Sequence, residues 1–222
     1  AFYGCTGIES LSLPGTMTDI GAGAFENCKE LKRVVLENGL LNISRDLFYG
    51  CTSLGSIEIP DTVIWVGDNA FRNTAYYNDE SNWENGILYA GEYLLDSNVG
   101  VSGVCKIKDG TRVIASCAFD NRSGITELVL PDTLDSIGSW AFRHCIGIKE
   151  IVIPDGIERI SSEAFLGCTG VEKISLPFVG PNREPYTDGK YSFGYIFGTL
   201  PTSLKTVTLT GDSIPEKAFY RC

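Results

Sequence analysis

Cysteine and histidine are the residue types of this 222-residue chain that could supply a nucleophile, a base or a metal ligand. The chain has eight cysteines and one histidine, and that histidine, His144, directly precedes Cys145. A thiol beside an imidazole is the arrangement of a cysteine nucleophile and its base. However, a single histidine disfavours histidine-based catalysis, and the lack of any C-x-x-C pair disfavours a zinc site. We therefore predict no catalytic residue, no metal site and no cofactor.

The spacing of the cysteines also argues against a nucleophile. Six of them share one position, three residues after a recurring phenylalanine: Cys5, Cys28, Cys51, Cys145, Cys168 and Cys222. Free cysteine is among the most buried residue types, so such a column indicates reduced thiols inside a core. Disulfides between neighbouring coils are the alternative, but parallel side chains fit the disulfide dihedral angle poorly. Cys117 falls in a variable column and is expected to be exposed.

Phenylalanine gives the chain its repeat. Successive members of two series are 23 residues apart: Phe2, Phe25, Phe48 and Phe71, then Phe119, Phe142 and Phe165. Because one coil of this length cannot bury its own apolar face, stacked coils are expected to share one continuous core. The sequence thus predicts a single solenoid domain over residues 1–222. Its predicted core columns are Phe25, Cys28, Phe48, Cys51, Phe71, Phe119, Phe142, Cys145, Phe165, Cys168 and Phe219.

Two short elements in each repeat would position these columns. An apolar residue alternates with an exposed one before a proline, as in Leu11–Pro14 and Ile151–Pro154. This alternation predicts a short strand with one buried face, and the proline ends its ladder. The A-F-x-x-C segment is too short for an independent helix and predicts one helical turn. Glycine or asparagine two residues after most of the phenylalanines would close that turn in the left-handed conformation.

These motifs resemble the BspA-like class of leucine-rich repeats, whose pattern is I-G-x-x-A-F-x-G-C-x-x-L-x-x-I-x-I-P-x-x-V. Ile20–Cys28 (I-G-A-G-A-F-E-N-C) and Ile137–Cys145 (I-G-S-W-A-F-R-H-C) carry it almost unbroken. The resemblance implies a mainly β, right-handed leucine-rich-repeat solenoid with repeats of about 23 residues. A parallel ladder would form one face and short helical turns the other. It also implies a secreted or cell-surface bacterial protein that functions in adhesion to host or neighbouring-cell molecules.

Two excursions interrupt the repeat, at about 76–103 and 178–202. The first contains two apolar runs, 87–89 and 93–95, which predict a β-hairpin around a three-residue loop, 90–92. Both excursions are rich in aromatic residues. We expect these to pack the excursions onto the solenoid, with partner binding by Trp83, Tyr89 and Tyr93 as the alternative.

The outward positions of the strands form the expected binding face of the solenoid. The candidate partner-binding residues there are Arg33, Val35, Ser56, Glu58, Glu127, Val129, Glu150, Val152 and Lys173. They include no basic stripe, and the formal net charge of the chain is −10, which argues against nucleic acid. No apolar run is long enough to cross a membrane, so no membrane insertion is expected.

The sequence therefore predicts a non-catalytic interaction module, extracellular or on a cell surface, that binds protein. Three alternatives stay open: a structural spacer that displays another domain, a glycan-binding module, and an enzyme with its site in an excursion. Because both ends of the chain lie in the same phase of the repeat, we expect a fragment of a longer array, with signal and anchor outside it. The identity of the ligand and the oligomeric state are left open.

Overall fold

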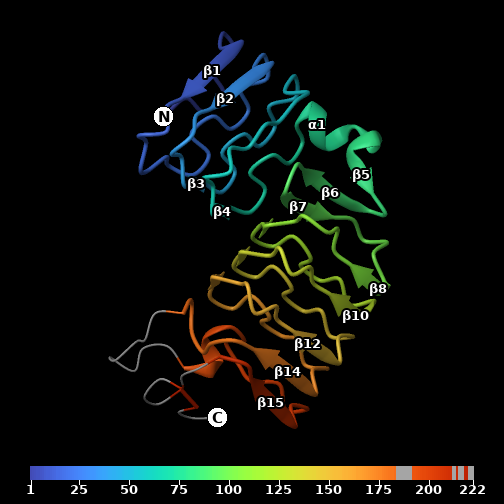
Figure 1. Ribbon diagram of the computed structural model, residues 1–222. Coiled ribbons are helices and arrows are strands. Elements are labelled where there is room, and N and C mark those ends of the chain that lie inside the picture. The colour runs from blue at the N-terminus through green and yellow to red at the C-terminus, as the bar shows by residue number, and fades with distance from the viewer. Residues whose placement is uncertain (184–191, 212–213, 215–217, 220–222) are drawn as a thin grey trace.

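The computed structural model describes residues 1–183, 192–211, 214 and 218–219. The chain winds as a solenoid of short strands with very little helix, and its coils follow one another from the N-terminus to the C-terminal strand β15 (Figure 1). The predicted fold class is confirmed.

One face of the solenoid carries the longer strands of the repeat. They are β1 (Ser10–Leu13), β2 (Arg33–Leu36), β8 (Gly103–Lys106), β10 (Ile125–Val129), β12 (Glu150–Val152), β14 (Lys173–Leu176) and β15 (Thr206–Leu209). In β14, Ile174 and Leu176 are buried while Lys173 is exposed, as the alternation predicts. All pairings in this ladder are parallel, but it is in three pieces: β1–β2, β8–β10 and β12–β14–β15. The equivalent segment around Ser56 and Glu58 forms no strand.

A second ladder is made of two-residue strands that precede five of the repeat phenylalanines, from Phe48 to Phe165. They are β3 (Asn42–Ile43), β4 (Trp65–Val66), β9 (Val113–Ile114), β11 (Ser136–Ile137) and β13 (Arg159–Ile160). The first excursion supplies β5 (Trp83–Glu84), β6 (Ile87–Ala90) and β7 (Tyr93–Ser97). Together with β9, β11 and β13 they form a six-stranded sheet of order β13-β11-β9-β7-β6-β5. The excursion is therefore built into the solenoid as part of this ladder.

The first excursion contains the predicted hairpin. It begins with one helical turn, α1 (Ala75–Asn78), capped by the Thr74 side chain, and continues through η1 (Glu80–Asn82) and β5 (Trp83–Glu84). Strands β6 (Ile87–Ala90) and β7 (Tyr93–Ser97) then pair antiparallel. Because Ala90 pairs with Tyr93, the loop has two residues, not the three that were predicted.

The A-F-x-x-C segments fold as successive hydrogen-bonded turns. In one coil, the N–H of Cys28 donates to the carbonyl of Phe25 (3.3 Å). The residue two positions after phenylalanine is left-handed throughout the series, from Asn27 (φ 58°) to His144 (φ 57°) and Gly167 (φ 71°), as predicted. These turns also bond to the next coil, since the N–H of Phe25 donates to the carbonyl of Leu47 (3.1 Å). The turns therefore connect the coils through backbone hydrogen bonds as the strands do.

The phenylalanine rings stack along the solenoid in two separate columns. Ring centroids are 5.3, 5.9 and 5.6 Å apart from Phe2 to Phe71, and 5.0 and 5.2 Å apart from Phe119 to Phe165. No ring contact joins Phe71 to Phe119 in the described structure, because the excursion between them brings no A-F-x-x-C segment. The buried residues accordingly form two clusters, which differs from the one continuous core we expected.

The end of the second column also departs from the prediction. Phe197 follows Phe165 in the stack, at 6.1 Å, and Phe193 of η2 (Phe193–Tyr195) contacts Phe197 at 5.6 Å. Phe219 contacts only Phe193 among these and is 39% exposed, so its assignment to the core was wrong. The second excursion thus takes the place that Phe219 was predicted to fill. Its residues 184–191 lie outside the described structure.

Candidate functional site

The strand face presents the predicted partner-binding residues to solvent. Arg33, Ser56, Glu58, Glu127, Glu150 and Lys173 are all exposed. Parallel pairing places them in two rows: Glu127 lies beside Val104, Glu150 beside Lys173, and Ser12 beside Val35. The alternation of each strand thus aims these side chains to one surface.

Four valines make this face apolar as well as charged. Val35, Val104, Val129 and Val152 are 39%, 63%, 36% and 55% exposed. Branched residues favour strands, so a single exposed valine needs no explanation, but several on one face of a repeat protein are typical of a contact surface.

A groove of about 500 Å³ runs between β10 and β12 on this face. Val129 and Val152 lie in it beside Glu127, Glu150 and Asp132, and Lys149 is the one basic residue of its lining. Three carboxylates against one ammonium give the groove a net negative charge. It therefore offers an apolar strip bordered by acidic groups.

The sequence analysis missed two residues of this face. Val104 and Lys106 flank Cys105, which pairs with Leu128 of the next coil. The alignment of Cys105 with Leu128 was visible in the sequence and would have identified both neighbours as outward-facing.

The aromatic residues of the first excursion serve packing. Tyr89 and Tyr93 are 6% and 2% exposed, so their proposed contact with a partner was wrong. The Tyr93 hydroxyl lies 2.7 Å from the carbonyl oxygen of Pro60 and 3.1 Å from that of Val63, and Tyr89 accepts a hydrogen bond from the Lys108 N–H. These bonds allow the two tyrosines to be buried, because a phenol hydroxyl inside a core needs a hydrogen-bond partner.

Trp83 is half-buried and belongs to the same packing. Its Nε1 donates to the carbonyl of Tyr77 (2.8 Å), and the two rings meet edge to face at 5.1 Å. Tyr89 and Tyr93 therefore fasten the excursion to neighbouring coils, as expected, whereas these contacts of Trp83 lie within the excursion.

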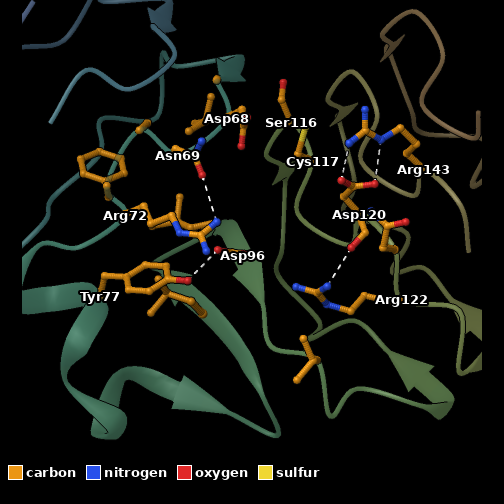
Figure 2. A pocket seen from close by; sticks show the side chains of 18 residues that line it. Asp68, Asn69, Arg72, Tyr77, Asp96, Ser116, Cys117, Asp120, Arg122 and Arg143 are labelled. Carbon is orange, nitrogen blue, oxygen red and sulfur yellow. Dashed lines mark hydrogen bonds and ion pairs between the residues drawn. The ribbon is translucent and has the colours of Figure 1, made fainter. Parts of the chain in front are cut away.

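A cavity lies where the phenylalanine stack is interrupted, between the coils of Phe71 and Phe119; we call it the stack gap (Figure 2). Its volume is about 360 Å³. Its lining includes the side chains of Asp68, Arg72, Asp96, Ser116, Cys117, Asp120, Arg122 and Arg143. Most of them come from two coils whose phenylalanines, Phe71 and Phe119, are 48 residues apart in the sequence. The hairpin between the two coils closes one side of the cavity.

Two carboxylates on one side of the stack gap are held in partly buried positions. Burial raises the pKa of Asp68, and the charges of Asp46 and Asp96 raise it further. Burial also raises the pKa of Asp96, although the Tyr77 hydroxyl donates to it at 2.9 Å. In both cases desolvation disfavours the charged form more than the nearby donors and arginines favour it.

On the opposite side of the stack gap, two arginines hold Asp120 and Ser97. Arg143 donates two hydrogen bonds to Asp120, from Nε to Oδ1 (2.7 Å) and from Nη2 to Oδ2 (2.5 Å). Arg122 donates to the carbonyl oxygens of Asp120 and Ser97 and to the Ser97 hydroxyl. A paired guanidinium of this kind is a structural tie between coils.

The thiols are poor nucleophiles. Burial raises the pKa of Cys117 to about 12, with Asp68 and Asp120 contributing, so the thiol is protonated at neutral pH. Cys117 is half-buried, which corrects its expected exposure. Cys145 is fully buried, its Sγ donates to the carbonyl of Phe119 (3.1 Å), and burial raises its pKa too. The pairing of His144 with Cys145 as base and nucleophile is therefore not supported.

The thiol column is a ladder of hydrogen bonds. Cys28, Cys51, Cys145 and Cys168 each donate from Sγ to the carbonyl oxygen of the phenylalanine 26 residues earlier, at 3.0–3.2 Å. The seven described cysteines are free, as predicted. Within the described ranges, no three His, Cys, Asp or Glu side chains come together as metal ligands. No helix among the same residues is long and apolar enough to cross a membrane.

A family comparison matches almost the whole chain. The profile of the BspA type leucine-rich repeat region matches residues 1–99 and 103–222, in six copies. Among curated proteins, no significant match was found.

Solved structures of bacterial proteins are similar to the chain. A leucine-rich cell surface protein from Faecalibacterium prausnitzii is 21% identical, with 95% of this chain and 62% of that one covered and a TM-score of 0.46. The pneumococcal vaccine antigen PcpA is 18% identical, with coverages of 95% and 58% and a TM-score of 0.43. A leucine-rich repeat protein from Bacteroides ovatus is 22% identical, with coverages of 100% and 66% and a TM-score of 0.37. The chain spans less than two thirds of each.

Proposed function

Because the chain belongs to the BspA-type leucine-rich repeat family, we propose that it is a non-catalytic module of a bacterial surface or secreted protein that binds another protein. The family supports an interaction role in general. The finer parts of the proposal are the extracellular location, an adhesive function and the strand face as the contact surface.

The observation that carries the proposal is the groove between β10 and β12. It is an open strip of exposed valine with acidic borders, on the surface formed by the outward strand positions. A surface of this kind excludes water over its apolar centre and selects partners through the charged rim.

The charge of the groove indicates the chemistry of the partner. Glu127, Glu150 and Asp132 outnumber Lys149, so a segment with lysine or arginine on either side of an apolar residue is complementary. The outward strand positions of the described ladder include no aromatic residue. Stacking of sugars therefore has no platform there, which favours protein over glycan.

The test is binding of the purified chain to an array of purified matrix proteins, bacterial surface proteins and glycans. We expect at least one protein to bind, and the double variant E127K/E150K to weaken that binding at least about tenfold, which corresponds to ~1.4 kcal/mol. The matched control is E30K/E158K, which makes the same change in net charge at two exposed glutamates outside the groove. Binding should survive in the control.

Two outcomes would contradict the proposal. Binding to glycans alone would favour the glycan-binding alternative. Absence of any binder, together with an unchanged function of the parent protein when the groove residues are replaced, would favour the structural spacer.

A further inference from the structure

The stack gap has a feature that the strand face lacks: a buried hydroxyl, that of Ser116, without a hydrogen-bond partner among the described residues. Asp68 and Ser116 occupy the same position of the repeat, three residues before phenylalanine, in the two coils that border the gap. In regular coils this position is exposed, as at Ala22, Arg45 and Ser162, whereas here Ser116 is buried and Asp68 half-buried. Here a cavity of about 360 Å³, within the size range of ligand pockets, lies between them.

Asp68 and Asp96 have no ion pair in the part of the chain that the structure describes. The charge of Arg72 acts on both carboxylates, but its side chain is exposed and donates to the side chain of Asn69 (3.3 Å). By contrast, Asp120 across the gap is fully engaged by Arg143. Among the described residues, the two carboxylates of the stack gap that form no ion pair are therefore those of Asp68 and Asp96.

Ser116 adds a second and independent observation. Its side chain lines the stack gap, it is 6% exposed, and its Oγ has no hydrogen-bond partner among the described residues. Buried hydroxyls are nearly always bonded, and each exception needs an explanation. Ser44, in the coil of Phe48, is bonded in the usual way, since its Oγ donates to the carbonyl of Ile20. A bound group in the cavity would give Ser116 its missing partner.

The backbone hydrogen bonds between coils are also interrupted at the stack gap. The N–H of each earlier stacked phenylalanine donates to a carbonyl of the next coil, as Phe48 does to Ala70 (2.8 Å). At Phe71 the described structure offers no such acceptor. The gap is therefore an interruption in a regular network and is not filled by the hairpin.

We propose that the stack gap binds an organic cation, a primary ammonium or a guanidinium group, between Asp68 and Asp96 with Ser116 Oγ as a further acceptor. Such a group donates several hydrogen bonds, and its positive charge can pair with the two partly buried carboxylates. The cation can come from a small free amine or from a lysine or arginine side chain of a partner. The site shares no residue with the strand face, so failure of the proposed function would leave this proposal unaffected.

Two arms of one calorimetric experiment distinguish these sources. Agmatine and N-acetyl-lysine methylamide are the free cations, and a short peptide with one internal lysine is the partner. The matched control peptide carries norleucine, which keeps the carbon chain and removes the charge. We expect the lysine peptide or the amines to bind and the norleucine peptide to fail.

Variants place the binding in the stack gap. Asp68→Asn and Asp96→Asn should each weaken cation binding at least about tenfold. Asp109→Asn removes an exposed carboxylate elsewhere and should leave binding unchanged. Ser116→Ala should raise the melting temperature of the free chain, because it removes an unsatisfied buried hydroxyl, and should reduce the further rise caused by the cation.

Three results would overturn the proposal. The first is equal binding of the lysine and norleucine peptides. The second is undiminished binding by both aspartate variants, with their folds verified by circular dichroism. The third is no binding of any probe with a Kd below about 10 mM.

Discussion

Replacing Phe142 by alanine tests whether the stacked rings stabilise the solenoid. The side chain is fully buried, and its ring lies between those of Phe119 (5.0 Å) and Phe165 (5.2 Å). Truncation of a buried phenylalanine costs about 3–5 kcal/mol of unfolding free energy through the cavity it leaves. The two ring contacts, worth about 0.5–1.5 kcal/mol each beyond burial, place the expected loss at the upper end. For a chain of this size the melting temperature should fall by about 6–20 °C.

The matched control is Trp140→Ala, two residues away in the same turn. Trp140 is 40% exposed, its Nε1 donates to Glu163 (2.7 Å), and Arg143 lies over its ring at 5.5 Å. These exposed contacts are worth about 1 kcal/mol, so the effect on stability should be small. Equal losses from the two variants would refute the assignment of one side chain to the core and the other to the surface.

The same variant also tests the division of the core. Because the buried residues form two clusters, Phe142→Ala should loosen the C-terminal cluster before the N-terminal one. Hydrogen exchange followed by mass spectrometry measures this directly. Peptides around Phe165 should lose protection while peptides around Phe48 keep it. Uniform loss over both regions would mean that the two clusters unfold as one unit.

Three further outcomes are expected. Tyr93→Phe should cost about 1–2 kcal/mol in guanidinium denaturation, because it removes the donor near two backbone carbonyl oxygens, and an unchanged midpoint would contradict this. The pKa of Asp68 is raised in the fold, so its contribution to stability is greatest at acid pH and is lost as the carboxyl ionises. Asp68→Asn should therefore raise the melting temperature at pH 7 and leave it unchanged at about pH 3, and a gain at both would disprove the cause. Alkylation mapped by peptide should reach half-buried Cys5 well before fully buried Cys145, and equal rates would show that the thiol column is open to solvent.

The repeat was readable because burial acts on every coil alike. A phenylalanine every 23 residues and a small thiol three residues later are the side chains that a stacked core selects, and both columns are buried where coils are regular. Alternation likewise predicted which strand residues face solvent, from Arg33 to Lys173. Regular periodicity predicts structure well because each repeat confirms the others.

The interruptions were harder to predict because one occurrence gives no period. The aromatic run of the first excursion was correctly expected to favour packing, yet Tyr93 and Tyr89 could not be separated from binding residues by type. Their burial depends on backbone carbonyls such as that of Pro60, which are distant in sequence. The stack gap is not visible in the sequence at all, since it arises from what the inserted segment omits.

A second left-handed position in each coil shows how tertiary structure overrides local preference. The residue two before phenylalanine has φ between 54° and 62° in six coils: Gly23, Asp46, Asn69, Cys117, Trp140 and Glu163. Tryptophan, glutamate and cysteine pay about 1–2 kcal/mol in this region, so composition gave no signal. The coil keeps the geometry because the N–H of Glu163, like that of Cys117, then donates to a carbonyl of the next coil. Where two neighbouring coils are stacked, the hydrogen bonds between them fix the backbone, and the side chain is free to vary.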